Sequence, residues 1–238
     1  NCYASAILTY QIPEIREEIK YFVFGAEIGK MTFENGAVIT SPISMSALMS
    51  EHLLQDMSDE EKGTVISAYT NLSQLWSTVF TDLNSAQLYA TIAIRIGENL
   101  PIGSKSILAL AYANWFKATL FANTVSKPNE DYSEAARAEA EKKITEIKDI
   151  GVNFNWESPY YASALLYAGQ YFGLLGDNER SLDLLLESEA AFIRREEFTV
   201  AQYLLPKLKE SYKELHPVKT ALGGFDRWFE GEVSRRIN

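Results

Sequence analysis

Residues Tyr160–Phe192, YYASALLYAGQYFGLLGDNERSLDLLLESEAAF, decide the fold of this chain. Apolar residues are dense from Ala162 to Leu175, and small residues recur among them, namely Ala162, Ala164, Ala168, Gly169 and Gly173. Small side chains let a helix approach its neighbour closely, because the distance between helix axes depends on the side chains at the contact. We therefore expect a helix here whose small residues press against a second helix.

The second helix is expected directly after a tight turn. Gly176-Asp177-Asn178 stops the first helix, since glycine accepts a positive φ and Asp and Asn favour turns and caps. Asn178 is the predicted N-cap of the second helix, with Glu179 in its first turn. One apolar side then recurs at helical spacing, in Leu182, Leu185, Leu186 and Ala190. The stretch predicts an αα-hairpin, two antiparallel helices joined by a short turn.

This hairpin resembles a tetratricopeptide repeat. The small, aromatic, turn and packing positions of that family are occupied here by Gly169, Phe172, Gly176-Asp177, Leu182 and Leu185. The chain also departs from the family pattern, because the early Trp is Leu165, the small residue early in the second helix is Ser181, and the closing Pro is missing. The resemblance implies an α-solenoid of stacked hairpins. A helical hairpin in an ordinary bundle is the alternative interpretation.

Further helices are predicted on both sides of this hairpin by caps, breaks and apolar periodicity. Before it, we expect helices over Pro13–Phe24, Ser41–Met57, Ser58–Phe80, Asn84–Glu98, Lys105–Phe121 with Ser104 as cap, and Tyr132–Ile150 with Gly151 as its end. After it, we expect helices over Thr199–Leu215, which Pro206 kinks or starts, and Lys219–Ile237. Asn35-Gly36 predicts either a short β-hairpin near residues 31–40 or a loop.

The predicted fold class is all-α, with stacked antiparallel helical hairpins in a tetratricopeptide-like α-solenoid. The hairpins fall near residues 58–98, 104–150, 160–194 and 198–237. Their irregular spacing favours divergent repeats over a tandem array of identical units. We expect residues 1–57 to form an irregular helical N-terminal section and residues 58–238 to form the repeat domain.

The charge balance argues against two classes of partner. Lys and Arg total 22 against 32 Asp and Glu, a formal net charge of −10 at pH 7. Nucleic-acid binders need a basic surface, and anionic membrane surfaces attract basic segments, so we expect neither partner. No apolar run approaches the length of a membrane-spanning helix, and no transmembrane span is expected.

Cys2 is the only cysteine, which argues against a disulfide framework and a thiolate metal cluster. The sequence begins at Asn1 rather than Met, and a cysteine beside a processed N-terminus can carry the lipid anchor of an envelope protein. The alternative is a free cysteine in a fragment, since Asn1 before Cys2 matches the lipid-attachment motif poorly. The expected compartment is the cell envelope or periplasm in the first case and the cytoplasm in the second.

No catalytic residue, cofactor or metal site is predicted. His52 and His216 are isolated, and the patterns GxSxG, GxGxxG and HExxH are absent. Carboxylates are plentiful, and those considered for acid–base chemistry are Glu60, Glu61, Glu139, Glu141, Glu187, Glu189, Glu196 and Glu197. We place them on the polar sides of amphipathic helices, where solvation is expected.

Aromatic residues provide the one positive functional signal. The first helices of two adjacent hairpins carry Tyr112, Trp115, Phe116, Tyr167, Tyr171 and Phe172. First helices line the concave surface in the tetratricopeptide family, so the resemblance implies a binding groove lined by Asn114, Trp115, Tyr167, Gln170 and Tyr171. Aromatic and amide groups suit contacts with peptides or small ligands. The alternative is that these side chains pack the interior.

The sequence therefore favours a non-enzymatic scaffold or adaptor that binds a protein segment in a concave groove. The Lys/Asn clamp that some family members use for a terminal carboxylate is not evident, because Leu166 and Gln170 stand in its place. The alternative function is that of a lipid-anchored envelope accessory protein that binds a small ligand or a transport or secretion partner.

Overall fold

The computed structural model describes residues 31–32, 38–39, 58–98, 100–125, 130–153, 158 and 160–237. Its elements are β1 (Met31–Thr32), β2 (Val38–Ile39), α5 (Asp59–Leu75), the π-helix η1 (Trp76–Phe80), α6 (Leu83–Gly97), the 3₁₀ helix η2 (Ile102–Ile107), α7 (Leu108–Val125), α8 (Glu130–Asn153), α9 (Tyr161–Leu174), α10 (Asn178–Arg194), α11 (Phe198–Leu215), α12 (Pro217–Ala221) and α13 (Gly224–Ile237). The helices predicted over Pro13–Phe24 and Ser41–Met57 lie outside the described residues, as do Cys2, Asn35-Gly36 and His52.

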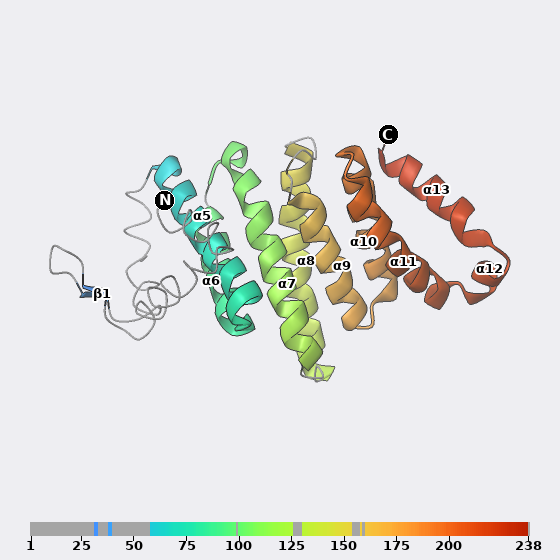
Figure 1. Ribbon diagram of the computed structural model, residues 1–238, viewed down its shortest axis with the longest axis horizontal. Helices are drawn as coiled ribbons and strands as arrows, with labels where there is room; N and C mark the ends of the chain where they lie inside the picture. The colour runs from blue at the N-terminus through green and yellow to red at the C-terminus, as the bar shows by residue number, and fades with distance from the viewer. Residues whose placement is uncertain are drawn as a thin grey trace, which may run out of the picture.

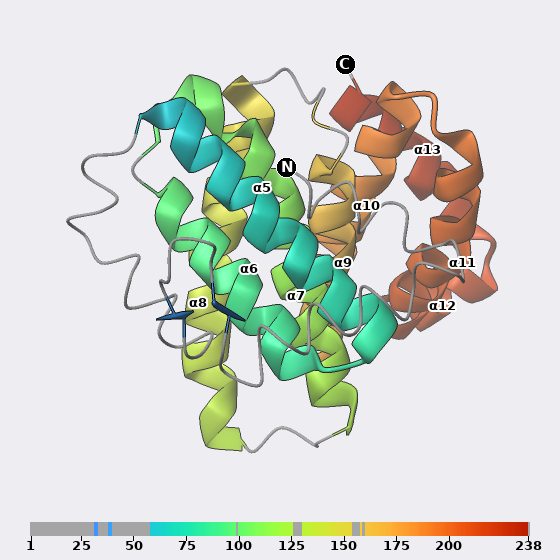
Figure 2. The same ribbon diagram turned by 60° about the vertical axis from the view of Figure 1, so that its left-hand side comes forward.

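Apart from the two short strands, the described part of the chain is helical, which confirms the predicted all-α class. The helices stand side by side in a row that follows the chain from α5 to α13 (Figure 1). Figure 2 brings the first end of the row forward, where α5 and α6 lie against each other. One apolar core runs through the row, from Ile66 in α5 to Val233 in α13. The strands β1 and β2 pair antiparallel, with Met31 opposite Ile39.

The α9–α10 pair meets as closely as its small residues predict. A methyl group added at Gly169 would lie 2.9 Å from Leu185 Cγ and 3.2 Å from the Leu185 backbone nitrogen. One added at Gly173 would lie 3.1 Å from Ser181 Oγ. The Ser188 hydroxyl, buried in the same interface, donates a 2.7 Å hydrogen bond to the Ala162 carbonyl. The nested hairpin predicted from the sequence is therefore confirmed.

The turn between α9 and α10 depends on Gly176, whose φ is +78°. The Asp177 N–H donates to the Phe172 carbonyl at 2.9 Å, and the Gly176 N–H donates to the Gly173 carbonyl at 3.0 Å. These are the two bonds of a Schellman motif, which requires a left-handed residue at this position. The predicted N-cap, Asn178, is wrong by one residue, because the Asp177 carboxylate accepts the capping hydrogen bond from the Arg180 N–H.

The turn between α10 and α11 repeats the same backbone bonds without a glycine. The Glu197 N–H donates to the Phe192 carbonyl at 2.9 Å, and the Glu196 N–H donates to the Ile193 carbonyl at 3.0 Å. Glu196 occupies the left-handed position, with φ +59°. Left-handed backbone costs a residue with a Cβ about 1–2 kcal/mol. The second turn therefore stores strain that the first avoids.

The structure corrects three predictions about where a helix starts, ends or continues. Ser104 does not cap α7, because its N–H donates to the Pro101 carbonyl and opens the 3₁₀ helix η2 instead. Gly151 does not end α8; it is buried in helical backbone, and the helix continues to Asn153. The helix predicted over Lys219–Ile237 is divided into α12 and α13 at Gly223, whose φ is +72°. Pro206 lies inside α11, which begins before it at Phe198.

We predict that Glu196→Gly raises the free energy of unfolding by about 0.5–1 kcal/mol, because glycine removes the Cβ from a left-handed position. The matched change Gly176→Ala places a Cβ at the equivalent position of the preceding turn and is expected to lower it by about 1 kcal/mol. Urea unfolding monitored by circular dichroism measures both. A lower unfolding free energy for Glu196→Gly would contradict the assignment of strain to this turn.

Candidate binding face on helices α7 and α9

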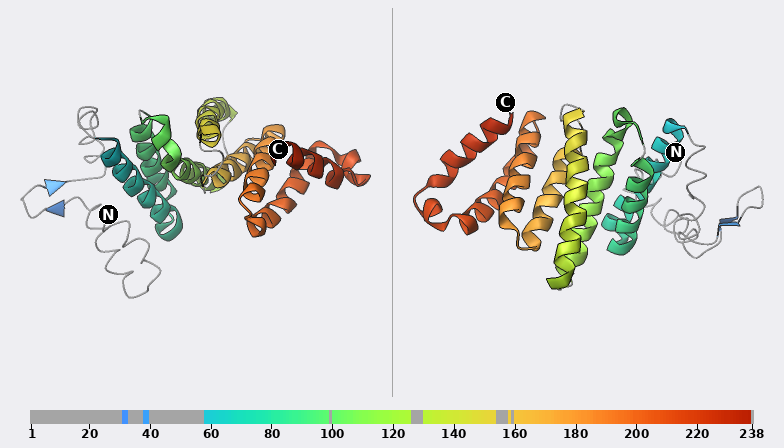
Figure 3. Two further views of the ribbon diagram at one scale, coloured as in Figure 1. Left: turned by 90° about the horizontal axis from the view of Figure 1, so that it is seen from above. Right: turned by 180° about the vertical axis from the view of Figure 1, so that it is seen from behind.

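Helix α8 covers one side of α7 and α9. Seen from above, α8 lies beside the row and next to both helices (left panel of Figure 3). The Tyr112 hydroxyl of α7 donates a hydrogen bond to the Glu146 carboxylate of α8. Lys143 of α8 lies over the ring of Trp115, with its amine 4.3 Å from the ring centre. Any binding surface on α7 and α9 must therefore lie on their other side.

Helix α7 has one partly exposed stripe, made of Leu110, Lys117 and Phe121. These residues fall on one line along a helix, since eleven residues make about three turns. Every residue from Leu108 to Leu120 outside this stripe is buried. The stripe lies roughly opposite Tyr112, the residue that contacts α8. It therefore faces away from α8.

Helix α9 presents a similar stripe in Ser163, Leu166, Tyr167 and Gln170, all half-buried. The opposite side of α9 is buried, including Leu165 and Phe172. The two helices pack directly on each other, and the rings of Phe116 and Tyr171 meet across the contact with centres 6.2 Å apart.

The α9 stripe lies roughly opposite Tyr161, whose hydroxyl is bonded to Glu187, the partner of Lys148 of α8, so it also faces away from α8. Since α7 and α9 pack on each other, the two stripes lie next to each other. We call this surface the α7–α9 face, and it consists of Leu110, Lys117, Phe121, Ser163, Leu166, Tyr167 and Gln170.

The α7–α9 face carries one charge. Lys117 is the only charged residue in the sequences of α7 and α9. Burial lowers the pKa of its amine, because desolvation disfavours the charged form. Burial also raises the pKa of the Tyr167 hydroxyl. Within the described ranges, Lys117 is in none of the ion pairs within or between helices.

Only two of the five residues predicted to line a groove lie on this face, Tyr167 and Gln170. The other three are buried and have partners inside the fold. Asn114 donates to the Thr70 carbonyl of α5 at 3.0 Å, Trp115 is turned toward Lys143 of α8, and Tyr171 packs on Phe116. Burial therefore removes Asn114, Trp115 and Tyr171 from the predicted binding surface. Lys117 and Phe121 take their place and were missed, although a lone charge in an apolar helix could have marked the exposed side.

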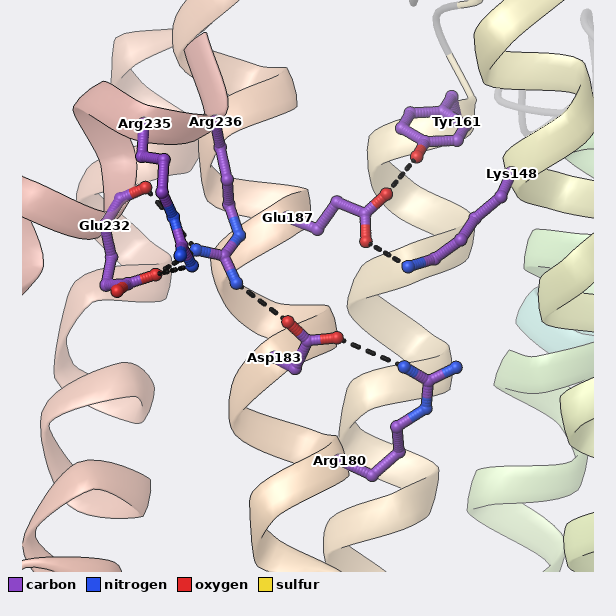
Figure 4. Close-up of polar contacts among 8 residues, drawn as sticks. All are labelled: Lys148, Tyr161, Arg180, Asp183, Glu187, Glu232, Arg235 and Arg236. Carbon is purple, nitrogen blue, oxygen red and sulfur yellow. Dashed lines mark hydrogen bonds and ion pairs between the residues drawn. The ribbon is translucent and has the colours of Figure 1, made fainter.

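The side of the row that includes α8 is built differently, from charged groups that neutralise one another (Figure 4). The Glu187 carboxylate of α10 accepts a 2.7 Å hydrogen bond from the Tyr161 hydroxyl of α9 and pairs with Lys148 of α8 at 2.6 Å. Asp183 of α10 pairs with Arg180 at 3.1 Å and with Arg236 of α13 at 2.7 Å.

The network continues at both of its ends. Arg180 also binds Glu141 of α8 at 2.7 Å, and Glu232 pairs with Arg235 and Arg236 within α13. The network holds α8, α10 and α13 together. The sequence did not predict the pairs between helices, because their members lie far apart along the chain.

The prediction that the carboxylates lie on solvated sides of helices is wrong for Glu189. It is 3% exposed, and its Oε2 atom has no hydrogen-bond partner among the residues that the structure places. Glu141 and Glu187 are neither left to the solvent nor buried without a partner, since each is paired with a cation on another helix.

No family model, curated protein or solved structure matches the chain. Within the described ranges, no three side chains of the metal-binding types gather into a possible metal site. None of the described helices is both long and apolar enough to cross a membrane. The lipid anchor predicted at Cys2 stays a prediction, because that residue lies outside the described residues.

We predict that Trp115→Ala and Tyr171→Ala each lower the free energy of unfolding by about 3–5 kcal/mol, because each removes a large side chain from the core. Tyr167→Ala and Gln170→Ala on the α7–α9 face should each cost less than about 1 kcal/mol. Chemical denaturation of the four variants measures the difference. Equal losses for Tyr167→Ala and Tyr171→Ala would mean that the assignment of the two tyrosines to surface and core is wrong.

Proposed function

We propose that this chain is a non-catalytic interaction protein that docks a segment of another protein on the α7–α9 face. The observation that carries the proposal is the composition of that face. It combines two aromatic side chains, two leucines, an amide, a hydroxyl and one lysine, with no carboxylate, in a chain whose net charge is −10. Aromatic rings and amides provide contact area and orientation in protein interfaces, in which charged residues other than Arg are depleted.

The single charge of the α7–α9 face indicates which kind of protein segment would bind there. An amine whose charged form is disfavoured by burial gains most from a carboxylate that arrives with the ligand. Because Lys117 is the only charge supplied by α7 and α9, a complementary segment brings an apolar surface with one acidic group. Phe121 and Tyr167 would contact the apolar part of that segment, and Gln170 could hydrogen-bond its backbone.

The architecture proposed with this function is a divergent stack of hairpins of the tetratricopeptide kind. The pairs α5–α6, α7–α8 and α9–α10 would be its units, with α5, α7 and α9 as their first helices. It is supported by the contacts of α7 with both α5 and α9, which are those expected between successive first helices in a stack. In that arrangement the α7–α9 face belongs to the inner surface.

Site-specific photo-crosslinking in cells tests the proposal. We expect p-benzoylphenylalanine at Phe121 and at Tyr167 to capture the same protein partner, identified by mass spectrometry. The matched control is Tyr160, which is 42% exposed, as is Phe121, and lies outside the face. The purified partner should then lose at least about tenfold in affinity with Lys117→Glu and change little with Lys207→Glu, an exposed lysine on α11. Capture from Tyr160 alone, or equal affinities for both charge variants, would contradict the proposal.

A further inference from the structure

One carboxyl group of α10, that of Glu189, is buried without an ionic partner among the described residues. The other acidic residues in the middle of the helix, Asp183 and Glu187, each pair with a cation on another element. Glu189 is 3% exposed, and its Oε2 accepts no hydrogen bond from the described residues. A buried carboxyl without compensation strongly disfavours the ionised form. Burial therefore favours the neutral, protonated form of the Glu189 carboxyl.

The position of Glu189 on α10 places it toward α11. The α9 side of α10 is marked by Leu185 and Ser188, which contact Gly169 and Ala162. The α13 side is marked by Asp183, which pairs with Arg236. Asp183 lies about a third of a turn from Glu189 around α10. Glu189 shares the remaining side with Leu182, Leu186 and Ile193, at helical spacing. Apart from α9, α13 and the ion-paired α8, the helix that packs on α10 is α11.

The side of α11 that is buried against the stack is mainly apolar. The residues of α11 buried against the stack are Ala201, Leu204, Leu208 and Tyr212. The ionisable residues of α11 other than Tyr212 are all exposed, namely Tyr203, Lys207, Lys209, Glu210, Lys213 and Glu214. Tyr212 lies nearly a full helix length from the α11 N-terminus, against Phe225 and Trp228 of α13.

The other neighbours of α10 also offer no partner in the described part of the chain, and Lys148 of α8 is paired with Glu187. Helix α9 contains no charged residue, and the hydroxyl of its Tyr161 is bonded to Glu187. The α13 charges nearest to α10, Glu232 and Arg236, are engaged with each other and with Asp183. Desolvation by burial raises the pKa of the Glu189 carboxyl to about 7.

The sign of the resulting pH effect follows from proton binding. Between the pKa of a glutamate in the unfolded chain and about pH 7, the folded protein holds the Glu189 proton while the unfolded chain releases it. The contribution of Glu189 to the contact of α10 with α11 is therefore fully present only below the pKa of the unfolded carboxyl. It weakens as the pH rises through that window, and above it an ionised carboxylate would sit in an apolar interface.

We propose that Glu189 is a proton-dependent latch, whose neutral carboxyl lets α11 dock on α10 and whose ionisation loosens α11 and exposes the Leu182, Leu186 and Ile193 side of α10. This device is separate from the α7–α9 face and does not rest on the function proposed for it. It would regulate the terminal part of the row, α11 to α13.

Hydrogen exchange of the full chain, read by mass spectrometry and corrected for intrinsic exchange rates, tests the latch. We expect the opening equilibrium of α11 amides to rise about tenfold between about pH 6 and about pH 8, while that of α7 amides stays constant. Glu189→Gln and the apolar variant Glu189→Met should each abolish the rise. Using both keeps the test valid if one variant fails to fold.

Two controls separate the latch from other titrating groups. Glu210→Gln changes an exposed carboxylate of α11 itself. His216→Gln changes the histidine at the C-terminal end of α11, whose ring packs on Tyr212 with centres 4.8 Å apart. Both controls should keep the tenfold rise. Unchanged α11 exchange in the parent chain, the same rise in both Glu189 variants, or loss of the rise in His216→Gln would overturn the proposal.

Discussion

The structure depends on the close approach of α9 and α10, where the absence of a side chain at Gly169 lets Leu185 reach the α9 backbone. Helix α9 is also the partner of α7, and α10 is the partner of α11 and α13. The pair therefore connects the two ends of the described row. Because interiors pack at high density, a wider separation here would displace helices on both sides.

Two kinds of interaction hold the remaining helices, and they occupy different places. Apolar side chains fill the row from α5 to α13, whereas ion pairs join α8, α10 and α13 beside it. The charged groups of this network pair with one another. The α7–α9 face is different in kind, since its one cation is without an ionic partner in the described part of the chain and its aromatic rings are partly exposed.

Local signals in the sequence predicted the helices and the first turn well. Gly176 and Asp177 determine a turn by their own backbone and capping chemistry, so no distant contact is needed. The turn at Glu196 was hidden because it makes the same bonds without glycine. The aromatic side chains were assigned less well. Helix α7 is apolar almost all round, so its periodicity does not distinguish the buried position of Trp115 from an exposed one.

The central claim is that α9 and α10 cannot accept a side chain between them. The most direct measurement is the free energy of unfolding of Gly169→Ala, compared with Gly231→Ala in α13, where an added methyl group meets nothing within 4 Å. Gly231→Ala should gain up to about 1 kcal/mol from helix propensity. Gly169→Ala should lose about 1–3 kcal/mol from overpacking against Leu185. An equal gain for both variants would contradict the claim.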